Sequence, residues 1–262
     1  TLILLMLFST GITYITYQSL KGQMFLLRDF NSNKYSITMD KIDNITPDLP
    51  NITVTTIPMK SIKARYYFNA KKYDRAIKLL NEGIPANPYL FFSENLKAQI
   101  FLKQNKIDSA FVNARKAFYG LPKNALHAST YAQALSLKRD LAEAKKVFEV
   151  LSEKSGEVIW KNFLIVLSQM VQSGEKDFIK FASQAFKLYP YDKELFSLKK
   201  LAVIGQANIN RAQVISNQGL AYFNNKLYVE AAIEFENAAN IDSLEYAHFE
   251  NAASAYFMAG DY

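Results

Sequence analysis

Few side chains in this sequence are of the types that perform catalysis or bind metals. Cysteine is absent, which excludes disulfides, thiolate zinc sites, iron–sulfur ligation and cysteine nucleophiles. The two histidines, His127 and His248, lie far apart in the chain and do not form the metal-binding pair at helical spacing. No glycine-rich phosphate loop and no nucleophile elbow occurs. We therefore expect no metal, no cofactor and no catalytic residue in this chain.

The acidic residues are also poorly placed for acid–base catalysis. They recur in small groups beside lysines, namely Glu143 with Glu149, and Glu230 with Glu234 and Glu236. At helical spacing such groups form ion pairs on a solvated face, whereas an acid–base couple must converge on one substrate. The sequence thus predicts that this part of the protein is not an enzyme and acts through binding.

Composition and charge narrow the class of protein further. The chain has 262 residues, of which 50% are hydrophobic, enough to bury a core. With only 9 glycines and 7 prolines, a β-sandwich built on many tight turns is disfavoured. The net charge is +7, but basic and acidic residues are interspersed and form no basic block. We therefore expect no nucleic-acid partner.

From residue 57 onward the sequence resembles itself at a period of 34 residues. Such a period indicates a repeat architecture, here with four units at 57–90, 91–124, 125–158 and 159–192. Small residues recur in each unit where two helices must approach closely, and proline ends the unit. The positions that carry this pattern are Ala64, Ala98 and Ala132; Ala76, Ala110 and Ala144; and Pro88 and Pro122.

The register of the repeat slips after Pro190. Residues 193–211 amount to about half a unit, and we expect an additional or lengthened helix there. A fresh frame covers 212–262, with one further repeat and the first helix of a truncated one. The apolar face of that last helix would lack its partner, so we expect the natural protein to continue.

Residues 1–20 form an apolar segment with three open interpretations. The run from Leu2 to Tyr17 carries no charge, and about 20 apolar residues span a bilayer core. It could be a transmembrane helix, the apolar region of a signal peptide or a buried soluble helix. No small-residue cleavage site follows Tyr17, so a transmembrane helix is favoured, either single or the last of several. The side of the membrane on which the repeats lie stays open.

Residues 21–56 are expected to be an irregular tether between this helix and the repeats. They show no sustained helical period, and Pro47 and Pro50 interrupt any helix there.

The repeat positions resemble those of the tetratricopeptide repeat (TPR) family. The first unit matches best, with Ala64, Tyr67, Tyr73, Ala76, Leu80, Gly83 and Pro88 at the signature places. The resemblance implies an all-α fold: a TPR-like α-solenoid of helix–turn–helix hairpins in a right-handed superhelix, preceded by the transmembrane helix and the tether.

The family resemblance also implies a concave groove, lined by the first helix of each unit, that binds a protein or peptide partner. Counting the family's groove places onto this sequence gives ten residues, namely Arg65, Phe68, Asn69, Asn95, Gln99, Lys103, Ser129, Gln133, Trp160 and Phe163. Amides, cations and aromatic rings of this kind could hold a peptide. Trp160 could instead belong to the core.

The whole layout has a second, more particular likeness. The apolar span, the tether and the stretches KARYYFNAKKYDRAIKLLNEGIPANPYL, DSAFVNARKAFYGLP and ENAASAYFMAGDY resemble the soluble tail of bacterial O-antigen ligase/polymerase-type membrane proteins. The sequence thus predicts a membrane-tethered TPR scaffold, anchored in the bacterial inner membrane through residues 1–20. The alternative is the tail of a multi-span enzyme whose catalytic part lies upstream of Thr1.

Overall fold

The structure is a computed structural model that describes residues 1–45 and 50–260. The described residues form 14 α-helices and two short 3-10 helices, and the only β pairing among them is an isolated bridge between Ile52 and Pro58. The prediction of an all-helical chain is confirmed. The chain divides into two compact units, Thr1–Arg139 and Asp140–Tyr262.

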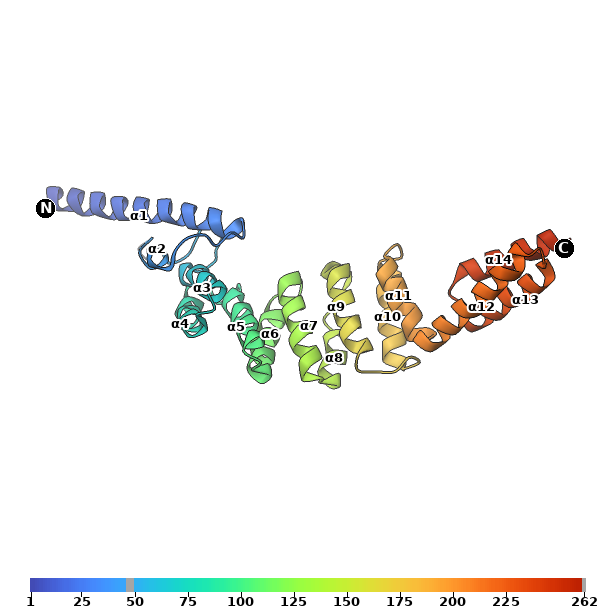
Figure 1. Cartoon of the computed structure of the whole chain (residues 1–262). Coiled ribbons are helices and arrows are strands. Elements are labelled where there is room, and N and C mark those ends of the chain that lie inside the picture. The colour runs from blue at the N-terminus through green and yellow to red at the C-terminus, as the bar shows by residue number, and fades with distance from the viewer. Residues whose placement is uncertain (46–49, 261–262) are drawn as a thin grey trace. The chain divides into compact units, whose positions relative to one another are not determined.

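In the first unit each helix from α2 to α7 packs against the next along the chain (Figure 1). Helix α5 also packs against α3 and α7, so these three helices are neighbours in space. The elements are α1 (Leu2–Asn31), α2 (Met39–Asn44), α3 (Met59–Asn69), α4 (Tyr73–Gly83), η1 (Ile84–Ala86), α5 (Phe92–Lys103), α6 (Ile107–Gly120) and α7 (Ala125–Lys138).

In the second unit α8 to α11 pack in sequence, α12 to α14 do the same, and α9 lies against both α10 and α11. Gly205, whose φ is +83°, separates α11 from α12. The stretch 193–211 therefore holds a separate helix and the beginning of a lengthened one. The elements are α8 (Leu141–Val147), η2 (Glu153–Ser155), α9 (Glu157–Ser168), α10 (Lys176–Leu188), α11 (Lys193–Val203), α12 (Gln206–Asn224), α13 (Tyr228–Ile241) and α14 (Tyr246–Ala259).

The sequence period of 34 residues has a counterpart in the backbone. Lys71, Asn105 and Arg139 all adopt the left-handed conformation, with φ between +56° and +58°. Each follows the first helix of a unit, where a left-handed residue ends the helix and reverses the chain. The repeated alanines are buried, as expected where two helix backbones approach closely.

The prediction of an irregular tether over 21–56 is wrong for much of its length. Helix α1 does not end near residue 20 but continues to Asn31, and α2 forms a further short helix. The cause is tertiary packing, because Gln23, Leu26 and Leu27 are buried in the core of the first hairpin. The spacing of these residues places them on one face of a helix. Pro47 lies outside the described residues.

Candidate partner-binding surface

Three side chains from consecutive first helices of the repeats lie in a row. Arg65 of α3 donates a hydrogen bond from Nη1 to Oε1 of Gln99 on α5, at 2.8 Å. Gln99 in turn donates from Nε2 to Oγ1 of Thr130 on α7, at 3.5 Å. These contacts form because α5 packs between α3 and α7. We call Arg65, Gln99 and Thr130 the α3–α5–α7 row.

The guanidinium of Arg65 is held between two aromatic rings. Its Cζ lies 4.9 Å from the ring centroid of Phe68 and 5.9 Å from that of Tyr35. Both distances are within the range of cation–π attraction. Stacking and the hydrogen bond to Gln99 fix the guanidinium, while a planar fork of five N–H donors leaves capacity for an oxygen of a partner. Arg65 is half-buried and therefore still accessible.

The remaining predicted residues of the first unit differ in exposure. Asn69, Lys103, Ser129 and Gln133 are exposed, whereas Asn95 is only 2% exposed. The side-chain oxygen of Asn95 has no hydrogen-bond partner among the described residues. The structure thus brings Arg65, Phe68 and Gln99 into contact and places four further predicted residues on accessible surface.

Thr130 is only 5% exposed, so it ends the row as a buried hydrogen-bond partner of Gln99, and it was not among the predicted groove residues. It follows Gln99 by 31 positions, so the strict period of 34 points to Gln133 instead. A hydroxyl residue one helical turn before Gln133 was the only signal available in the sequence.

Three predicted groove residues are corrected by their burial, namely Asn95, which is 2% exposed, and two aromatic residues of α9. Trp160 and Phe163 on α9 are 0% and 1% exposed. The indole Nε1 of Trp160 donates to the backbone oxygen of Ser152 at 3.1 Å, and its ring packs against Phe148. Neither side chain is accessible to a partner, so both belong to the core of the second unit.

The two histidines lie in different surroundings, and His248 is close to the ion pairs of Lys200 with Asp242 and Glu245. The Nδ1 atom of His127 lies 3.1 Å from the backbone oxygen of Ala117, and burial lowers the pKa of this imidazole. Burial likewise lowers the pKa of His248. No group of three or more His, Cys, Asp or Glu residues suitable for a metal ion occurs within 1–45 and 50–260.

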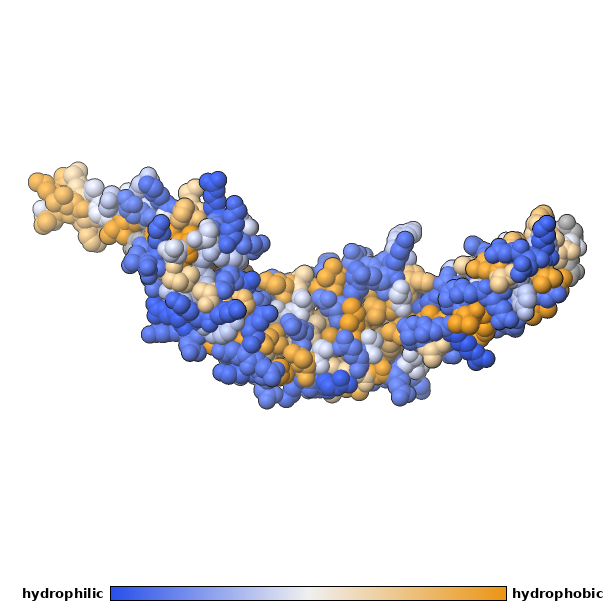
Figure 2. All heavy atoms as spheres, viewed as in Figure 1, coloured by the Kyte–Doolittle hydropathy of each residue, from blue (hydrophilic) through white to orange (hydrophobic). Residues whose placement is uncertain are grey.

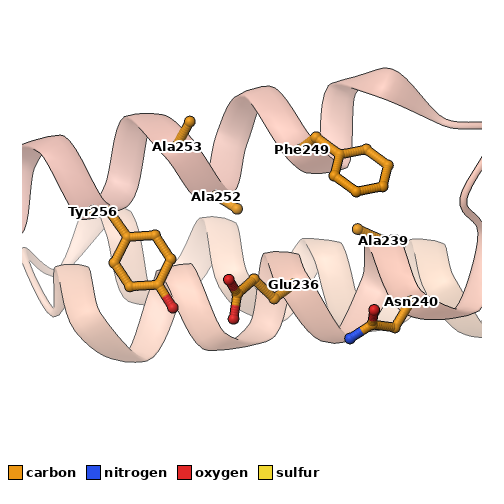
Figure 3. Close-up of a pocket in the computed structure, with 7 residues that line it drawn as sticks. All are labelled: Glu236, Ala239, Asn240, Phe249, Ala252, Ala253 and Tyr256. Atoms are coloured by element: carbon orange, nitrogen blue, oxygen red, sulfur yellow. The ribbon is translucent and has the colours of Figure 1, made fainter. Parts of the chain in front are cut away.

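A second surface feature lies between α13 and α14 in the other unit. A hollow of about 440 Å³ is lined by Glu236, Ala239 and Asn240 on α13 and by Phe249, Ala252, Ala253 and Tyr256 on α14 (Figure 3). Three alanines lie in the hollow, and the carboxylate of Glu236 and the amide of Asn240 lie at its side. It is open to solvent and resembles the flank of a helix pair more than an enclosed ligand site.

The N-terminal half of α1 is apolar, as the hydrophobic colour at this end shows (Figure 2), and almost all of its residues are exposed. Side chains Leu2 to Phe8 are each at least 60% exposed. Helix α1 is long and apolar enough to cross a membrane, although a signal sequence would pass the same test of length and composition. The hydroxyls of Thr10 and Thr13 donate to the backbone oxygens of Met6 and Ser9. These polar groups are thus satisfied inside the helix, as lipid requires.

Comparison of the sequence with protein-family models and with curated proteins gave no match.

Proposed function

We propose that this chain is a membrane-anchored helical-repeat scaffold that binds a protein or peptide partner along the α3–α5–α7 row. The observation that carries the proposal is the contact of Arg65 with Gln99, one repeat apart on neighbouring helices. Side chains at equivalent places thereby form one continuous surface. A peptide lying across these helices would meet the Arg65 cation, the amides of Gln99 and Gln133, and the Phe68 ring.

The architecture proposed for this scaffold is a TPR-like solenoid of helix–turn–helix hairpins with a right-handed superhelical twist. The recurring left-handed residues Lys71, Asn105 and Arg139 and the buried alanines support it. In such an array each hairpin buries its apolar face against the next, which leaves an extended surface for partners. The hollow between α13 and α14 fits this architecture as a flank where another helix could pack.

The proposed anchor is the free half of α1, inserted in a bacterial inner membrane. Apolar side chains exposed around the whole helix, together with internally bonded hydroxyls, support insertion in lipid. The same features suit the last span of a multi-span enzyme of the O-antigen ligase/polymerase type. In that alternative the repeats would position partners for a catalytic part encoded upstream, and the full open reading frame distinguishes the two proposals.

A site-specific photocrosslinking experiment tests the partner-binding surface. A benzophenone amino acid placed at Lys103 or at Gln133 should crosslink one partner in membranes. The same group at Lys78, exposed on the outer helix α4, serves as the control position and should not. Equal crosslinking from all three positions would indicate contact without a defined surface.

The affinity of the identified partner then tests the named side chains. Replacing Arg65 and Gln99 of the row and the neighbouring Gln133 together with alanine should weaken binding at least tenfold, because the surface loses its cation and two amides. Helix content, measured by circular dichroism, should stay the same. The control pair Lys78→Ala and Val112→Ala, on α4 and α6, should bind as the wild type. Unchanged affinity of the triple variant would refute the row as the binding site.

A further inference from the structure

The part of α1 that docks on the repeats carries a second, unpartnered face. Its docked face is formed by Ser19, Gln23, Leu26, Leu27 and Phe30. At 100° per residue, the opposite side of the helix is occupied by Tyr17, Lys21, Met24, Phe25 and Arg28. We call these five residues the outer face of α1.

The outer face is both apolar and basic. Met24 is 71% exposed and Phe25 57% exposed. Lys21 and Arg28 are exposed beside them, and neither has an ion-pair partner among the described residues. Apolar side chains flanked by cations are characteristic of helices that lie in the headgroup layer of an anionic membrane.

We propose that the outer face of α1 binds the anionic headgroup layer of the membrane, so that α1 crosses the bilayer surface tilted toward this face. Met24 and Phe25 enter the interfacial layer, and Lys21 and Arg28 contact lipid phosphates. The proposal rests on the proposed membrane anchor and adds the orientation and the lipid charge that the anchor recognises.

Helix geometry determines how far α1 must tilt. Ser19 and Gln23 are covered by the rest of the first unit. Lipid cannot surround the helix at these residues, so the hydrocarbon core must end near Thr16. Met24 then lies about 12 Å farther along the axis, whereas the headgroup layer is only roughly 5–8 Å thick. An upright α1 would therefore leave Met24 in water. A tilt of about 40° is at the upper end of the range for membrane helices. It brings the outward side chain of Met24 to about 6 Å from the edge of the hydrocarbon core.

Two other occupants of the outer face fit it less well. A second copy of α1 packed in parallel on the same face would place Lys21 and Arg28 beside their own counterparts, and like charges repel. The other helices of the first unit do not cover the outer face, because their contacts with α1 lie on the opposite side of that helix. A lipid surface satisfies the apolar side chains and the cations together, and it is continuous with the membrane that holds the free half of α1.

The absence of cysteine permits a direct test with single labelled cysteines in the full chain. The variants Met24→Cys, Phe25→Cys, Leu5→Cys and Val112→Cys each carry an environment-sensitive fluorophore in vesicles of phosphatidylethanolamine and phosphatidylglycerol. Labels at 24 and 25 should be quenched by a nitroxide on the lipid headgroup at least twofold more than the label at 112. The label at 5 should be quenched by a nitroxide within the acyl chain.

The outcomes separate this inference from the anchor itself. If the label at 5 is quenched while those at 24 and 25 behave as the label at 112, the anchor stands and the tilted outer face is refuted. If the label at 5 is not quenched, the anchor fails. The proposal is also overturned if a second copy or another protein, and not lipid, is found to cover positions 24 and 25.

A charge-matched pair of variants tests the role of the two cations. Lys21→Gln with Arg28→Gln should lower the headgroup quenching at position 24 at least twofold in anionic vesicles. Lys106→Gln with Lys123→Gln removes the same charge from exposed positions of the first unit and should leave the quenching unchanged. Equal quenching of the labelled Met24→Cys protein, with Lys21 and Arg28 intact, in vesicles of phosphatidylcholine alone would refute recognition of anionic lipid.

Discussion

Trp160 provides the sharpest test of the distinction between core and partner-binding surface. Its side chain is 0% exposed, its Nε1 donates to the backbone oxygen of Ser152 at 3.1 Å, and its ring centroid lies 5.8 Å from that of Phe148. Replacement of a buried tryptophan by alanine costs about 3–5 kcal/mol, because it removes apolar contacts and leaves a cavity. Phenylalanine keeps most of the contacts but leaves the Ser152 oxygen without its donor, at a cost of about 1–3 kcal/mol.

We therefore expect the free energy of unfolding to fall in the order wild type, Trp160→Phe, Trp160→Ala. Urea unfolding followed by circular dichroism at 222 nm measures this order without relying on tryptophan fluorescence. Trp160 is the only tryptophan, so its accessibility to acrylamide can be measured directly in the wild type, and quenching should be far weaker than for free tryptophan. Acrylamide quenching as strong as that of free tryptophan would refute the assignment to the core. A Trp160→Phe variant as stable as the wild type would refute it as well.

Three further variants test the packing and the electrostatics. Leu26→Ala should cost about 2–5 kcal/mol in local stability, since Leu26 is 0% exposed, and hydrogen exchange should become faster over residues 19–31 while the repeats stay protected. Gly83→Ala should destabilise the first hairpin, because the added Cβ would lie 2.5 Å from Oγ of Ser61; a urea midpoint equal to that of the wild type would contradict the packing. A hydrogen bond from Lys200 holds the pKa of Glu245 below its usual value and outweighs the opposing effect of burial. A depressed carboxyl pKa stabilises the fold above the unfolded value and loses that contribution as the pH falls. The urea midpoint of the wild type should therefore drop below about pH 4.5, and that of Glu245→Gln should drop less.

The repeat could be predicted from sequence because its cause is local and periodic. Helices that must approach at fixed intervals need small residues such as Ala76 and Ala110, and both are buried. The turns that end the first helices adopt the left-handed conformation at Lys71 and Asn105. Nothing in these two residue types demands that conformation, so only the period of the flanking helices locates the turns.

The continuation of α1 could not be predicted with the same ease. Its first half is apolar on all sides, which hides the helical period that begins at Ser19 and continues through Gln23, Leu26 and Phe30. The burial of a glutamine further obscures the pattern. Gln23 is buried because its Nε2 can donate to the backbone oxygen of Pro50, at 3.3 Å, which is a contact that sequence spacing does not reveal.

The exposure of the predicted groove residues was foreseen only in part, for a reason visible at Trp160 and Phe163. Counting places along a repeat gives the direction of each Cβ but not the distance that the side chain reaches or what lies over it. Small or flexible polar residues at such places, for example Ser129, remain accessible. Large rings fill the interior wherever neighbouring helices leave room, and the same count then selects core residues.

The anchor helix and the binding row are joined by one short turn of the first unit. Asn33 and Tyr35 adopt left-handed conformations, with φ of 54° and 48°, which are costly for residues other than glycine and persist only where surrounding contacts impose them. Asp29 at the end of α1 accepts hydrogen bonds from the backbone N–H of Ser36 and from the hydroxyl of Tyr66, and these bonds hold the turn.

Tyr35 is thereby fixed against two groups of the repeats. Its ring packs edge-on against Tyr66, at 5.3 Å between centroids, and the guanidinium of Arg65 lies over its other side. The position of Arg65 therefore depends on the docked end of α1. In the proposed membrane-anchored scaffold, α1 would leave no slack between the bilayer and this contact, and the row would be held at a fixed distance from the bilayer. A tether would let such a scaffold search for partners, whereas this arrangement would present the row at one height and in one orientation.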